Sequence, residues 1–200
     1  MHYGSLSFRD RVIYVFDELY LNVYRSPLEV IALVMALAVL FWTLLRSIWH
    51  CRFRRVWRWC NRSLVVLSVA LILVVSFWNR TPGTYPPALV PFASLIAART
   101  QPEYYREMLM NILLYLPLGL SLGSSWADGM RIRQILGWTV LCGTALSLLV
   151  ECIQGIFQLG TMETDDVIRN TMGTLLGVLH IPLAYLLCRL SKTITSHIKS

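Results

Sequence analysis

Long apolar runs with at most one acidic or basic residue alternate with polar segments over most of this chain. Five runs are long enough, or almost long enough, to cross a bilayer as helices. They occupy residues 28–45, 64–78, 108–122, 135–157 and 171–190. The second and third runs, each of fifteen residues, reach about 22 Å as helices, whereas a hydrocarbon core is about 30 Å thick. We therefore expect these two helices to extend into flanking residues, unless the bilayer thins around them.

The first 27 residues carry a different, amphipathic pattern. Their apolar side chains recur at helical spacing, with charged and amide side chains elsewhere on the helix surface. The apolar positions are Val12, Val15, Phe16, Leu19, Tyr20 and Val23. This pattern predicts a helix that lies on the bilayer surface and ends at Pro27. The stretch does not show the features of a cleaved leader, so we predict no removable signal peptide.

Prolines interrupt the segment between the second and third runs, residues 79–107. Pro82, Pro86, Pro87 and Pro91 exclude a continuous helix and predict a structured loop or a re-entrant segment. Within it, residues 88–96 are too apolar for a solvated linker. We expect this stretch to lie on the membrane surface or to fold back against the helices.

The composition supports the same fold class. The 200 residues are 56% hydrophobic and 14% charged, with a mean hydropathy of +0.57, which excludes the usual soluble enzyme classes. We predict an all-α polytopic membrane helix bundle of about five transmembrane helices plus the N-terminal amphipathic interfacial helix. The predicted units are the amphipathic helix 1–27, a two-helix hairpin 28–78 with a basic cytoplasmic loop, a membrane domain 79–190 and a cytoplasmic tail 191–200.

The charges predict an orientation. Six arginines lie between Arg46 and Arg62, interleaved with tryptophans, which favours a loop facing anionic lipid over a nucleic-acid partner. With this loop inside, the cytoplasmic segments hold eleven of the 18 Lys and Arg residues. The amino terminus is then outside and the carboxy terminus cytoplasmic. Five cysteines without a Cys-x-x-Cys pair indicate neither a disulfide framework nor a zinc site.

Glu151 is a carboxylic acid inside the apolar fourth run. Together with Thr144, Ser147, Gln154 and Gln158 it falls at steps of three or four, so these polar groups form one helix face that must avoid lipid. Two readings of Glu151 remain open. It is either a structural, protonated hydrogen-bond donor to Gln154, Asn111 or a backbone carbonyl, or a group that works through its proton or charge.

The loop before the fifth run is acidic. Asp165 or Thr164 is a natural N-cap for the following helix, and Asp166 would share a helix face with Asn170. In the third run, Asn111 precedes Pro117, which frees the backbone carbonyl of Leu113, and we expect this carbonyl to be a polar partner of Asn111. These polar groups fall toward the outer side of the predicted topology.

Several features have structural explanations. Small residues at Gly119, Gly123, Gly173 and Gly177 favour close helix packing. His180 has no companion at metal-ligand spacing and is expected to be a hydrogen-bonded core residue. The chain contains no phosphate loop, serine-nucleophile motif or His-Glu-x-x-His motif, so we predict no cofactor and no metal site.

Taken in order, these motifs resemble the VanZ-like family of bacterial membrane proteins. The motifs that carry the resemblance are Pro91-Phe92, Asn111 with Pro117-Leu118-Gly119, Glu151-x-x-Gln154, and Asp165-Asp166-x-x-x-Asn170-x-x-Gly173-x-x-x-Gly177. They cover about residues 89–190. The resemblance implies a small polytopic protein of the bacterial cytoplasmic membrane, from a family whose founding member is associated with resistance to the glycopeptide teicoplanin.

Three functions fit these residues. In the first, an outer-leaflet pocket of Asn111, Gln154, Asp165 and Asn170, with Glu151 and Asp166, binds a membrane lipid, an envelope precursor or a glycopeptide. In the second, Glu151 and Asp166 are the catalytic acid and base of a membrane-embedded enzyme that modifies an envelope lipid or peptidoglycan precursor. In the third, Glu151 carries protons in coupled transport, although the chain lacks the internal repeat of many transporters.

Overall fold

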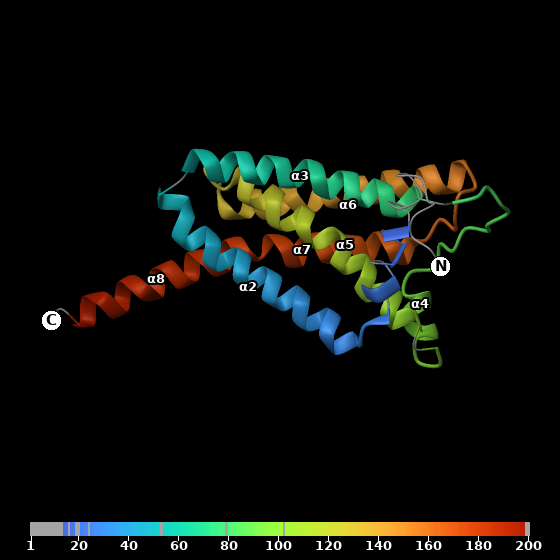
Figure 1. The fold of residues 1–200 in the computed structure, drawn as a ribbon, viewed down its shortest axis with the longest axis horizontal. Coiled ribbons are helices and arrows are strands. Elements are labelled where there is room, and N and C mark those ends of the chain that lie inside the picture. The colour runs from blue at the N-terminus through green and yellow to red at the C-terminus, as the bar shows by residue number, and fades with distance from the viewer. Residues whose placement is uncertain are drawn as a thin grey trace, which may run out of the picture.

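The computed structural model describes residues 14–15, 17–18, 21–23, 25–52, 54–78, 80–101 and 103–198, without the side chains of 48–54 and of residues beyond 190. The helices run in the order α2 (Leu28–Arg52), α3 (Arg54–Phe77), α4 (Ala93–Ala97), α5 (Glu103–Trp126), α6 (Ile132–Ile156), α7 (Thr164–Val178) and α8 (His180–Ile198) (Figure 1). Most of the predicted amphipathic helix over 1–27 falls outside the described residues and stays a prediction.

Within the residues that the structure describes, five helical segments are long and apolar enough to cross a membrane, which confirms the predicted bundle. They are Leu28–Ser47, Arg55–Phe77, Glu103–Trp126, Ile132–Ile156 and Thr164–Leu190. The two short apolar runs do extend into flanking polar residues, to 23 and 24 residues. The fifth span begins seven residues earlier than the apolar run, because its first two turns are polar yet packed inside the protein.

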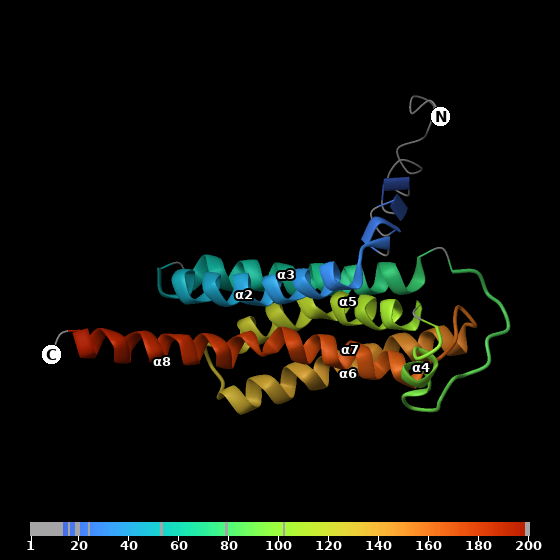
Figure 2. The ribbon, with the colours of Figure 1, turned by 90° about the horizontal axis from the view of Figure 1, so that it is seen from below.

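Helix α5 lies at the centre of the bundle and packs most extensively on α7. Helices α2 and α3 cover one side of α5, and α6 lies against α7, so the helices form two layers (Figure 2). Apolar clusters fill the contacts on both sides of α5, with Ile31 and Leu116 in one cluster and Ile72 and Tyr115 in another. The polar residues discussed below lie at one end of this packed core.

Helices α7 and α8 are separated by a break at Leu179. Pro182 explains it, because proline cannot donate a hydrogen bond to the carbonyl four residues earlier and its ring crowds that carbonyl. At the break, Nδ1 of His180 contacts the carbonyl of Gly177 and Nε2 contacts the hydroxyl of Ser124, both at 2.8 Å. The fully buried His180 ring therefore has a polar partner at each nitrogen.

The proline-rich segment folds back against the bundle, which was one of the two predicted alternatives. The backbone of Ala88 pairs with the loop between α6 and α7, donating to the carbonyl of Met162 at 2.9 Å and accepting from Thr164 at 3.2 Å. Further back, Gly83 donates to the carbonyl of Gln158 at 2.9 Å. The segment thereby closes over the end of the bundle at which α3, α5, α6 and α7 meet (Figure 1).

Candidate functional site

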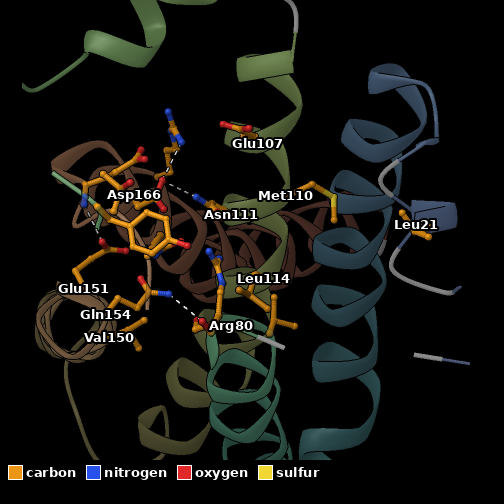
Figure 3. Close-up of a pocket in the computed structure, with 18 residues that line it drawn as sticks. Leu21, Arg80, Glu107, Met110, Asn111, Leu114, Val150, Glu151, Gln154 and Asp166 are labelled. Carbon is orange, nitrogen blue, oxygen red and sulfur yellow. Dashed lines mark hydrogen bonds and ion pairs between the residues drawn. The ribbon is translucent and has the colours of Figure 1, made fainter. Parts of the chain in front are cut away.

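A polar cavity of about 530 Å³ lies at the end of the bundle opposite the turn between α2 and α3. Helices α3, α5, α6 and α7 supply its walls, together with the loops at that end (Figure 3). Its charged and amide lining residues are Arg80, Glu107, Asn111, Glu151, Gln154, Glu163, Asp166, Arg169 and Asn170. Five of the six residues proposed from sequence as catalytic or binding groups, all except Asp165, therefore share one cavity.

Helix α6 contributes Glu151 and Gln154, on a face turned into the protein. The carboxylate of Glu151, only 2% exposed, accepts the backbone N–H of Glu163 at 2.9 Å through Oε2. Gln154 donates to the carbonyl of Ser76 on α3 at 2.9 Å. The partners expected for Glu151 as a protonated donor are not those found, because the loop after α6 turns back and presents an N–H to the carboxylate.

Asp166 lies in the first turn of α7 and is held from two sides. Its Oδ1 accepts the side-chain amide of Asn111 on α5 at 2.8 Å. The same oxygen forms an ion pair with Arg169, at 2.9 Å. The expected partner of Asn111, a carbonyl freed by Pro117, is replaced by this carboxylate, which is the stronger acceptor.

Asp165 points away from the cavity and holds the proline-rich segment. Its carboxylate accepts the backbone N–H groups of Phe92 and Ser94 and the hydroxyl of Ser94. Arg169 also donates to that hydroxyl. The predicted N-cap at Thr164 or Asp165 is wrong: the capping position is Glu163, without a side-chain cap bond, because Asp165 instead satisfies N–H groups at the start of α4.

Asn170 supplies a buried polar atom without a partner. Its side-chain nitrogen donates to the hydroxyl of Ser147 on α6 at 2.9 Å. Its Oδ1 makes no hydrogen bond within the described part of the chain, although the residue is only 6% exposed and lines the cavity. An unpaired buried carbonyl oxygen costs about 1–3 kcal/mol, so this position calls for a hydrogen-bond donor.

The sequence did not single out Arg80, Glu107 or Glu163. Glu107 stands one helical turn before Asn111, a spacing that could have suggested a shared face. Burial raises the pKa of Glu163 above its ordinary value, and the nearby Asp166 carboxylate raises it further. Arg80 lies three residues beyond the end of α3 and enters the same space between α5 and α6 (Figure 3). With all groups ionised, four carboxylates face two guanidinium groups.

Glycines bring α5 and α7 close together beside the cavity. A Cβ atom on Gly173 would collide with the backbone carbonyl of Ile112, and one on Gly177 would collide with that of Leu116. From α5, Gly119 lies against the backbone of Thr174, and a Cβ on Gly123 would lie 2.7 Å from a methyl group of Val178. This approach lets the short side chains of Asn111 and Asp166 meet across the interface.

The residues that line the cavity suit hydrogen bonding and charge neutralisation. Among the residues that the structure describes, no three His, Cys, Asp or Glu side chains are arranged to hold a metal ion. The cavity offers ionisable carboxylates and a guanidinium group at Arg80, and it is also lined by Asn170, whose buried Oδ1 is unpaired within the described residues. Such a lining can hold a polar group that carries several hydrogen-bond donors.

Comparison with known proteins gives one family and one relative. The model of the VanZ/LLP1 family matches residues 63–187. Protein VanZ of Enterococcus faecium is 35% identical over 74 residues, which cover 37% of this chain and 43% of that protein. The aligned region is thus less than half of that relative's length. No solved structure matches the chain.

Proposed function

Because the chain belongs to the VanZ/LLP1 family and has five helices able to span a membrane, we propose that its polar cavity is a binding site in the bacterial cytoplasmic membrane. The site takes the polar head of an envelope lipid, a cell-wall precursor or a glycopeptide, and the protein thereby reduces susceptibility to glycopeptides such as teicoplanin. The single observation that carries this proposal is that Asn170, whose buried Oδ1 is unpaired within the described residues, lines a cavity with excess carboxylate.

The ligand head group carries hydrogen-bond donors and, in its preferred form, a positive charge. Asp166 is already neutralised by Arg169, which leaves Glu107, Glu151 and Glu163 against Arg80. A protonated amine reduces this imbalance, and its N–H groups suit the amide oxygen of Asn170. Ethanolamine phospholipids and amine-bearing glycopeptides both present such a group.

The cavity opens to the outer face of the membrane in this proposal. The Arg-rich turn between α2 and α3 lies at the opposite end of the bundle, and arginine-rich loops stay in the cytoplasm. The amino terminus is then outside and the carboxy terminus inside. This orientation gives the cavity access to the leaflet in which glycopeptides meet their target.

A membrane-embedded enzyme is the second candidate, because Glu151 and Asp166 line the same cavity. In that role one carboxylate accepts a proton from an envelope lipid or precursor while the other stays ionised. Asp166 already accepts a hydrogen bond from Asn111 and pairs with Arg169, and Glu151 already accepts a backbone N–H. Because both carboxylates have these partners, binding is favoured over proton transfer.

Teicoplanin protection of cells tests the proposal with a matched pair of variants. Both Glu103 and Glu107 are exposed residues of α5, but only Glu107 lines the cavity, so Glu107→Gln removes a carboxylate of the site and Glu103→Gln is its control. We expect Glu107→Gln to lose most protection at equal protein level and Glu103→Gln to keep it. Equal protection by both variants would overturn the binding site.

Mass spectrometry of lipids and cell-wall precursors from the same cells separates the two candidates. A binding protein should co-purify with an amine-bearing amphiphile and leave its covalent structure unchanged. A new covalent product that depends on the protein would instead support the enzyme.

A further inference from the structure

A second cavity, of about 680 Å³, lies at the other end of the bundle. It is bounded by the end of α2, by α8 and by the turn that joins α5 to α6. Helices α2 and α8 pack against each other here, and α8 then continues beyond the rest of the bundle (Figure 1). The cavity shares no lining residue with the one described above.

Two guanidinium groups, those of Arg46 and Arg189, line this cavity. Nη1 of Arg46 is buried and has no hydrogen-bond partner within the described residues. Asp128, in the turn between α5 and α6, acts on the charge of Arg46 but does not line the cavity. Because two arginines line one cavity and one of them has an unsatisfied buried donor, the cavity suits an anion with several acceptor oxygens.

The remaining walls are apolar and lie at the depth of a lipid head group. Met130, Ile135, Ile181 and Ala184 are among the residues that line them. Arg46 lies next to the end of the span Leu28–Ser47, and Arg189 lies next to the end of the span Thr164–Leu190. Both arginines therefore stand where a membrane helix leaves the hydrocarbon, beside a surface that can accept an acyl chain.

We propose that this cavity binds an anionic phospholipid, with the phosphate between Arg46 and Arg189 and an acyl chain along α8. Charge complementarity selects the phosphate, and the apolar walls select a lipid over a free anion. Arg131, the N-cap residue of α6, and Arg133, in its first turn, lie at the same end and add to the attraction for an anionic leaflet. The bound lipid fastens α2 to α8 and stabilises the folded bundle.

Thermal unfolding of the full-length protein in detergent tests this site with three probes: phosphatidylglycerol, phosphatidylcholine and inorganic phosphate. Phosphatidylglycerol should raise the Tm of the parent, and the other two should not. Arg189→Gln removes a guanidinium at an exposed position, so the variant should fold. Arg133→Gln is the matched control, because it removes an exposed charge at the same end that does not line the cavity.

Binding of phosphatidylglycerol, measured by native mass spectrometry, should weaken about fivefold for Arg189→Gln and again for the double variant with Arg46→Gln, but little for Arg133→Gln. Equal weakening by Arg133→Gln would overturn the site in favour of general attraction to the basic end. A full response to inorganic phosphate, or undiminished lipid binding by Arg189→Gln, would also overturn the proposal. None of these readouts depends on the amine-binding cavity at the other end.

Discussion

The side-chain amide of Asn111 donates a hydrogen bond of 2.8 Å to Oδ1 of Asp166, joining α5 to α7 at the polar end of the bundle. The same oxygen forms the ion pair with Arg169, which also reaches the hydroxyl of Ser94 beside Asp165. The polar cavity and the folded-back segment are thus connected through one arginine. A substitution in the cavity should therefore affect the folded-back segment, and a substitution in that segment should affect the cavity.

Replacing Asn111 by Ala should destabilise the protein by about 1 kcal/mol, since it removes a bond to a carboxylate that has one other side-chain partner. Chemical denaturation in mixed detergent micelles measures this change. Gln101→Ala, an exposed amide just before α5, serves as the control and should leave the free energy of unfolding unchanged. An unaltered value for Asn111→Ala would mean that the bond contributes nothing to holding α5 on α7.

Gly173 and Gly137 form a second matched pair. A Cβ on Gly173 collides with the backbone of Ile112, whereas a Cβ on Gly137 of α6 has nothing within 4 Å. Alanine in place of an exposed helical glycine gains about 1 kcal/mol, and overpacking costs about 1–3 kcal/mol. Gly137→Ala should therefore raise the Tm and Gly173→Ala should lower it. A rise for both variants would contradict the tight α5–α7 contact.

The helices of the bundle could be predicted from sequence because lipid-facing segments must be apolar over a fixed length. Their ends could not be predicted, because the first turns of α7 carry Asp165, Asp166 and Arg169. Such residues look like a solvated loop until a partner is known. Here Ser94, 75 residues before Arg169, and Asn111, 55 residues before Asp166, are the partners. A local sequence pattern does not reveal contacts between residues so far apart in the chain.

The candidate site shows the same limit. Glu151 and Gln154 stood out because polar groups at helical spacing inside an apolar run must face the protein. Arg80 and Glu107 did not, since they flank the apolar runs, where charged residues are common. Only the folding of the proline-rich segment over the end of the bundle explains why Arg80 enters the cavity.

Glu163 gives a prediction for pH. Its pKa in the folded protein lies above the ordinary 4.5, chiefly because burial disfavours the charged form. The unfolded chain therefore releases this proton more readily, and the parent loses stability as the pH rises from about 4.5 through the folded-state pKa. Glu163→Gln removes that loss and keeps the backbone N–H that binds Glu151. Its Tm advantage over the parent should widen with pH across this window, and a constant or narrowing difference would contradict the shift.

Thiol labelling of two single-cysteine variants, in a background without native cysteines, tests the proposed orientation of the protein in the membrane. Gly129→Cys places a thiol at an exposed position in the turn between α5 and α6. Thr84→Cys places one at an exposed position of the proline-rich segment, at the other end of the bundle. A membrane-impermeant thiol reagent on intact cells should label position 84 only, and both positions after permeabilisation. Labelling of position 129 in intact cells would reverse the topology.

Glu151→Gln separates a site that binds through hydrogen bonds from one that uses a proton or a charge. Glutamine has almost the same shape, and its carbonyl oxygen can still accept the N–H of Glu163, but it cannot ionise. If the carboxylate serves only to hold the loop after α6, the variant should keep normal abundance and normal protection against teicoplanin. If its charge attracts an amine, protection should fall while the variant stays folded.

Asp166→Asn is the companion variant in the same cavity. It weakens the ion pair with Arg169 but keeps an oxygen that can accept the amide of Asn111, so it changes charge more than shape. A charge-dependent binding site predicts a graded loss for each single variant and a larger loss for the double variant, because each carboxylate contributes to one field. An acid/base pair predicts that either substitution alone abolishes activity, since the chemistry needs both groups. Full protection by the double variant would mean that both carboxylates have only a structural role.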